Sequence, residues 1–194
     1  MIFFKQDHFF VALVVASIFL FSCSKDDDEN DNINPTSTLT INDGRIAFDV
    51  SGFENTSIEG NVVYYLNNQY SIKYFNISDD EGIMHNNKTW YINFEQNSND
   101  NIDLPEPGEY PIVQGSENTY DQTSFNATIS AWTDLMTETG TSFGGNNGAI
   151  SGTLKIISNT DGIVKGTFSF EASSEDGEKI SVTNGQFAAP KNTW

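Results

Sequence analysis

The most regular stretch of the sequence is ISGTLKI at residues 150–156, followed by NTDG at residues 159–162 and VKGTFSFEA at residues 164–172. In the first and third segments, apolar residues or glycine occupy every second position and polar residues occupy the positions between them. Side chains of a β-strand point alternately to opposite faces, so this pattern predicts two strands that each bury one face. The NTDG segment between them predicts a turn.

A third segment continues this pattern toward the end of the chain. Ile180 and Val182 alternate with polar neighbours, whereas Phe187 falls on the opposite phase, which predicts a β-bulge at Asn184–Gly185. Because short connections leave neighbouring strands antiparallel, we expect the three strands to form a meander.

Upstream segments with similar alternation or dense apolar content predict further strands, and no segment has a convincing helical period. These segments are Ile46–Val50, Val62–Leu66, Tyr70–Tyr74, Trp90–Phe94, Glu109–Val113 and Phe125–Ala131. Asn67–Asn68 predicts a tight hairpin between the second and third of them. We therefore expect an all-β domain, a single antiparallel β-sandwich or flattened barrel of about eight or nine strands ending in the meander.

The N-terminal part has a different character. Phe9–Phe21 carries no charge and follows Lys5. This length suits the apolar region of a signal peptide, whereas about 20 apolar residues are needed to span a bilayer. We expect residues 1–22 to be a lipoprotein signal peptide, residues 23–38 an acidic, disordered tether, and residues 39–194 a single β domain.

The junction after the apolar run resembles the lipobox of bacterial lipoproteins. It reads Leu20-Phe21-Ser22-Cys23, and Phe21 departs from the small residue most common at its place. The resemblance implies that Cys23, the single cysteine of the chain, carries acyl chains such as palmitate. Its lipid would consume the thiol, which leaves no cysteine for a disulfide, a zinc site or thiolate catalysis.

The acidic run after this cysteine resembles a surface-export signal of Bacteroidota-type lipoproteins. Its residues are Lys25, Asp26, Asp27, Asp28 and Glu29. The resemblance implies a protein anchored in the outer membrane by its N-terminal lipid and facing the exterior. A run of like charges is also typical of a solvated, extended linker, and both roles are compatible.

The closing β pattern is similar to that of uncharacterised Bacteroidota-type lipoproteins with a domain of unknown function. The segments that carry this resemblance are Ser151–Ile156, Val164–Phe170, Val182–Phe187 and Pro107–Ile112. They consist of strand and turn residues, so the resemblance bears on the fold. The family has no assigned catalytic residue and implies none here.

Charge and motifs exclude several classes of function. A net charge of −18 repels phosphate backbones, so we expect no nucleic-acid partner. No acidic cluster matches a calcium-binding loop, which favours solvated loop charge and neither a metal nor a cofactor. Gly140–Gly144 matches G-x-S-x-G by letters, but a Gly-Asn-rich segment follows it and His85 precedes it, so a glycine-rich loop explains it better than a nucleophile elbow.

We therefore expect no enzyme, but a non-catalytic binding or structural module whose partner is a glycan or an envelope protein. Tyr91 and Trp132 lie on the phase opposite the apolar sets of their strands, which makes them candidates for stacking on a ligand. Burial of both faces of the sheet would make the same two residues core. The alternatives are a lipocalin-like carrier of a small apolar ligand and a hydrolase with two carboxylates from different strands.

Overall fold

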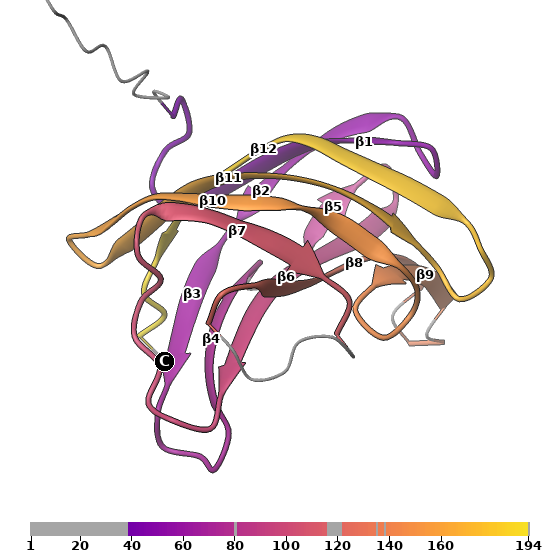
Figure 1. Ribbon diagram of the computed structural model, residues 1–194. Coiled ribbons are helices and arrows are strands. Elements are labelled where there is room, and N and C mark those ends of the chain that lie inside the picture. Colours follow the sequence, from indigo (N-terminus) through magenta and orange to yellow (C-terminus); the bar gives the residue numbers. More distant parts are fainter. Residues whose placement is uncertain (1–38, 80, 116–121, 135, 138, 194) are drawn as a thin grey trace, which may run out of the picture. The chain divides into compact units, whose positions relative to one another are not determined.

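Twelve β-strands form a single mixed sheet in the part of the chain that the computed structural model describes, which comprises residues 39–79, 81–115, 122–134, 136–137 and 139–193 (Figure 1). The strands are β1 (Arg45–Ser51), β2 (Thr56–Asn61), β3 (Val63–Asn67), β4 (Lys73–Ser78), β5 (Ile83–His85), β6 (Lys88–Ser98), β7 (Gly108–Val113), β8 (Phe125–Asp134), β9 (Thr139–Gly144), β10 (Ile150–Thr160), β11 (Ile163–Ser173) and β12 (Lys179–Pro190). These ranges contain no helix, so the all-β prediction is confirmed. In particular, they hold no helix long and apolar enough to cross a membrane. Cys23 and the segment Lys25–Glu29 lie outside the described residues.

The sheet follows the order β2-β1-β12-β11-β10-β7-β8-β6-β4-β3, with β5 added to β6 and β9 added to β8. Neighbouring strands are antiparallel, except that β7 and β8 run parallel over Ile112 and Val113. The predicted count of eight or nine strands is therefore too low for the described residues, and the sheet is not purely antiparallel.

The sequence did not predict three of these strands, because their alternation of apolar and polar residues is weak. β2 has one large apolar residue, Ile58, and β5 is only three residues long. β9 contains two glycines and one buried aromatic residue, Phe143. Each of these strands forms because it pairs with a longer neighbour, and not because its own residues strongly favour a strand.

The C-terminal meander of β10, β11 and β12 is confirmed, and so is its bulge. Both ladders of β12 shift register next to Asn184, whose φ is +54°. The Asn184 side chain donates a 2.8 Å hydrogen bond to Asp49 on β1, which holds the pKa of that carboxyl below its ordinary value. The bulge changes the phase of β12, so that Val182 and Phe187 both face the core.

The predicted tight hairpin at Asn67–Asn68 is wrong in length. β3 and β4 do form an antiparallel hairpin, but residues 68–72 connect them, and Tyr70 and Ile72 are exposed. The Asn68 side chain instead bonds both backbone groups of Ile102, at 2.9 Å each. A long-range contact therefore fixes this loop, and no local turn rule predicts such a contact.

The two strands at opposite ends of the sheet order are consecutive in the chain. β2 pairs with β1, β3 pairs with β4, and only the buried residue Val62 separates β2 from β3. Near the C-terminus, the backbone N–H of Asn192 donates to the carbonyl of Tyr64 on β3 at 2.8 Å. The sheet consequently curls back toward itself.

The concave side of the sheet holds one continuous apolar core. The rings of Phe94 on β6 and Phe168 on β11 lie 4.8 Å apart, although three strands separate β6 from β11 in the sheet order. Further aromatic pairs join Phe48 to Phe168 and Phe75 to Phe125. The rings of Phe94 and Phe168 therefore join the two halves of the sheet in one core.

Candidate functional site

The outer face of β6 carries a row of polar and aromatic side chains. Its outward residues are Tyr91, Asn93, Glu95 and Asn97, each partly exposed, and the residues between them are buried. The strand alternation that buries Trp90, Ile92 and Phe94 therefore aligns these four side chains along one line.

The register between β6 and β8 places Tyr91 next to Trp132. Tyr91 lies opposite Ser130 on β8, and Trp132 lies opposite Thr89 on β6. The two aromatic residues are therefore diagonal neighbours on one face, a spacing within reach of aromatic side chains. Both are partly exposed, so neither belongs to the buried core.

Each of these rings covers a glycine of a neighbouring segment. A Cβ atom placed on Gly82 would lie 2.9 Å from Cζ of Tyr91, and one placed on Gly140 would lie 2.8 Å from Cδ2 of Trp132. Any larger residue at either glycine would collide with the ring. The absence of a side chain at these two glycines therefore leaves room for the two rings.

Amide groups beside the row are oriented by hydrogen bonds. Asn76 of β4 donates from Nδ2 to Oδ1 of Asn93, and Asn97 donates from Nδ2 to Oε1 of Glu95 at 2.7 Å. Oδ1 of Asn76 and Oδ1 of Asn126 are both buried and have no hydrogen-bond partner among the residues that the structure describes. We call the outer surface formed by Tyr91, Asn93, Glu95, Asn97, Asn76, Asn126 and Trp132 the β6 strip.

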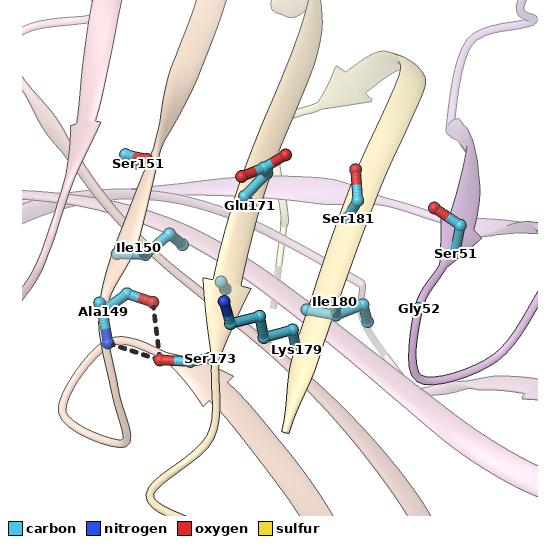
Figure 2. A pocket seen from close by; sticks show the side chains of 11 residues that line it. Ser51, Gly52, Ala149, Ile150, Ser151, Glu171, Ser173, Lys179, Ile180 and Ser181 are labelled. Carbon is cyan, nitrogen blue, oxygen red and sulfur yellow. Dashed lines mark hydrogen bonds between the residues drawn. The ribbon is translucent and has the colours of Figure 1, made fainter. Parts of the chain in front are cut away.

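A second outer surface lies across β10, β11, β12 and β1. Ser151 pairs with Glu171, Glu171 with Ser181, and Ser181 with Ser51, so the four side chains form one row across four strands. Figure 2 shows this row, with Lys179 extending from β12 toward β11 beside it. These residues line a groove of about 450 Å³, which we call the serine groove.

His85 takes part in a cluster at the β2–β5 contact. Its Nε2 lies 2.6 Å from Oγ1 of Thr56, and the nearby Glu54 forms an ion pair with Lys88. The hydrogen bond from Lys88 is the main reason that the pKa of Glu54 lies below its ordinary value. The ammonium of Lys88 also lies 5.1 Å from the ring centroid of Phe53. This cluster fixes the segment between β1 and β2 over the core.

Two sequence expectations need correction. Gly140–Gly144 forms strand β9, not a loop, and the Ser142 hydroxyl bonds that of Ser130 at 2.8 Å. Asp79 is not solvated loop charge, because it is 9% exposed and accepts backbone hydrogen bonds from Ile92 at 2.6 Å and Gly82 at 2.7 Å. Its carboxylate fastens the connection between β4 and β5. Within the described ranges, no three His, Cys, Asp or Glu side chains are grouped so as to hold a metal ion.

Comparison with protein-family models, with curated proteins and with solved structures gives no match for this chain.

Proposed function

We propose that this protein is a lipid-anchored, non-catalytic module of the outer bacterial surface that binds an extended glycan along the β6 strip. The observation that carries the proposal is the alignment of Tyr91, Asn93, Glu95 and Asn97 on one outer face, with Trp132 diagonal to Tyr91. Aromatic rings offer apolar contact to the C–H faces of a sugar, and amides and carboxylates match its hydroxyl groups.

The dimensions of the strip suit a chain of several sugars. Outward residues on a strand are about 6.8 Å apart, so Tyr91 and Asn97 are separated by about 20 Å. Gly82 and Gly140 leave room for the two rings, and the amides are oriented by their own hydrogen bonds. Such preorganisation lowers the entropy lost when a ligand binds.

Anchoring at Cys23 and surface export through Lys25–Glu29 are the parts of the proposal that rest on the lipoprotein resemblance. The full chain has a net charge of −18, and this strong solvation suits exposure to the medium. For the sheet we propose a flattened barrel, a shape supported by the continuity of β2 with β3 at the two ends of the sheet order.

The two alternative functions have weaker support. A carrier needs an apolar cavity, whereas the rings of Phe94 and Phe168 meet at 4.8 Å between the two halves of the sheet. A two-carboxylate hydrolase needs its acids within about 5–9.5 Å of each other. The β6 strip contributes one carboxylate, Glu95.

Binding of soluble protein lacking residues 1–38 to a glycan array, followed by titration calorimetry with each hit, tests the proposal. We expect Tyr91→Ala, Trp132→Ala and Glu95→Gln each to weaken binding about tenfold or more, a loss of about 1.4 kcal/mol. Tyr70→Ala is the matched control, because Tyr70 is an exposed tyrosine in the β3–β4 loop.

Thermal denaturation of the same variants separates binding from folding. Loss of affinity with a folded, cooperative domain supports the β6 strip as the site. An equal loss in Tyr70→Ala, or binding that survives all three strip substitutions, would contradict it.

A further inference from the structure

We infer that the serine groove is a second binding site, for a small zwitterion of the α-amino-acid class. This site lies on β10, β11, β12 and β1 and shares no residue with the β6 strip. The inference does not depend on the glycan-binding proposal.

The groove holds two opposite charges that have no partner within the described residues. Glu171 and Lys179 are both exposed, and neither makes an ion pair or a side-chain hydrogen bond there. They occupy adjacent outward rows on neighbouring strands, because Glu171 pairs with Ser181 and Lys179 pairs with Ser173. A carboxylate and an ammonium group are thus presented side by side at the spacing of diagonal neighbours.

Small residues around these two side chains create the hollow. Ser151 and Ala149 flank it on β10 and in the loop before that strand, and Ser51 and Gly52 flank it at the end of β1 (Figure 2). Gly52 has a φ of +91°, and a Cβ atom there would lie 2.8 Å from the carbonyl oxygen of Lys179. The backbone of β1 can therefore approach β12 closely only because this position is glycine.

Hydroxyl groups complete the polar lining. Ser173 is engaged, since its Oγ accepts a 3.0 Å hydrogen bond from the backbone N–H of Ala149. By contrast, the hydroxyls of Ser51, Ser151 and Ser181 make no hydrogen bond within the described residues, and these three residues line the groove (Figure 2). A hydroxyl can donate to a carboxylate or accept from an ammonium group.

The charges and the size of the groove define the ligand class. A volume of about 450 Å³ lies in the range of small-molecule sites. The ammonium group of an α-amino acid would bind Glu171, its carboxylate would bind Lys179, and the serines would bind the remaining donors and acceptors. Hydrogen bonds in which both partners are charged are the strongest of this kind. A ligand with a single charge would leave either Glu171 or Lys179 without an ionic partner.

An NMR titration of the folded domain tests the inference with matched probes. Alanine carries both charges, alanine amide lacks the carboxylate, and N-acetylalanine lacks the ammonium group. We expect alanine to shift the backbone signals of Gly52, Ser151 and Ser181 saturably. Each single-charge probe should bind about tenfold more weakly or worse.

Substitution of each charged side chain tests whether it contributes to alanine binding. Glu171→Gln and Lys179→Gln should each weaken alanine binding about tenfold or more. Glu109→Gln and Lys155→Gln are the controls, because this carboxylate and ammonium lie on neighbouring β7 and β10 but are paired with each other at 3.4 Å. Both controls should leave alanine binding unchanged.

Three outcomes would overturn the inference. The first is the absence of saturable shifts with alanine in the intact domain. The second is equal binding of N-acetylalanine that is lost only in Lys179→Gln, which would mean a simple anion site. The third is binding of a neutral sugar in the groove that persists in both Glu171→Gln and Lys179→Gln.

Discussion

Replacement of Phe168 by alanine tests how far the two halves of the sheet depend on the rings between them. Phe168 is 4% exposed, and its ring centroid lies within 6.3 Å of the rings of Phe48, Phe94, Phe170 and Phe187. A buried phenylalanine removes roughly 150–250 Å² from water, which at about 25 cal/mol per Å² corresponds to an upper value of about 4–6 kcal/mol. Because alanine keeps the Cβ atom and the neighbours partly relax, we expect a loss of about 3–5 kcal/mol in the free energy of unfolding.

Urea denaturation of the domain, followed by tryptophan fluorescence and circular dichroism, measures this loss. For a domain of this size, each kcal/mol shifts the thermal midpoint by about 2–4 °C, so the midpoint should fall by roughly 10 °C. Thr167→Ala and Ser169→Ala are the controls, since both side chains lie on the outer face of β11. Each should change the free energy of unfolding by less than about 1 kcal/mol.

A double-mutant cycle then isolates the contact across the core. The rings of Phe94 and Phe168 lie 4.8 Å apart, and such pairs are coupled by about 0.5–1.5 kcal/mol. A cost of less than about 1.5 kcal/mol for Phe168→Ala would refute the packing argument. Equal costs for Phe168→Ala and Ser169→Ala would mean that both faces of β11 are covered.

The remaining predictions concern the anchor, the export signal and acid stability. Cys23→Ala should leave an unacylated precursor that salt washing removes from membranes; persistent membrane association would contradict lipidation at this residue. Replacement of Asp26–Glu29 by serine should keep the protein membrane-bound but hide it from protease added to intact cells, whereas unchanged cleavage would reduce this run to a linker. Lys88 lowers the pKa of Glu54 in the folded state, so the stability from this pair is present above the ordinary carboxyl pKa and is lost as pH falls through the folded value. Glu54→Gln should therefore flatten the dependence of the denaturation midpoint on pH in that acid range, and an unchanged dependence would show that the pair contributes nothing.

Several features of the fold follow from the sequence because they are local. The two-residue alternation in residues 164–172 determines which side chains of β11 face the core, since side chains of a strand must point to opposite faces. The phase change between Val182 and Phe187 reveals the bulge, because only an extra residue can return both side chains to one face. The outward phase of Tyr91 and Trp132 is likewise a local property of β6 and β8.

The neighbours of those residues, in contrast, are decided by pairing between distant segments. The Thr89–Trp132 pair sets the β6–β8 register and thereby places Trp132 beside Tyr91, and a shift of one residue would turn every side chain of a strand to the other face. The ladders from β10 to β1 likewise assemble Ser151, Glu171 and Ser181 into one row, although alternation alone marks them merely as polar outward residues. Weak strands such as β2 and β9 form because established neighbours offer them unpaired backbone groups. Register and strand pairing depend on the energy of the whole packed sheet, so tertiary structure alone assembles the β6 strip and the serine groove.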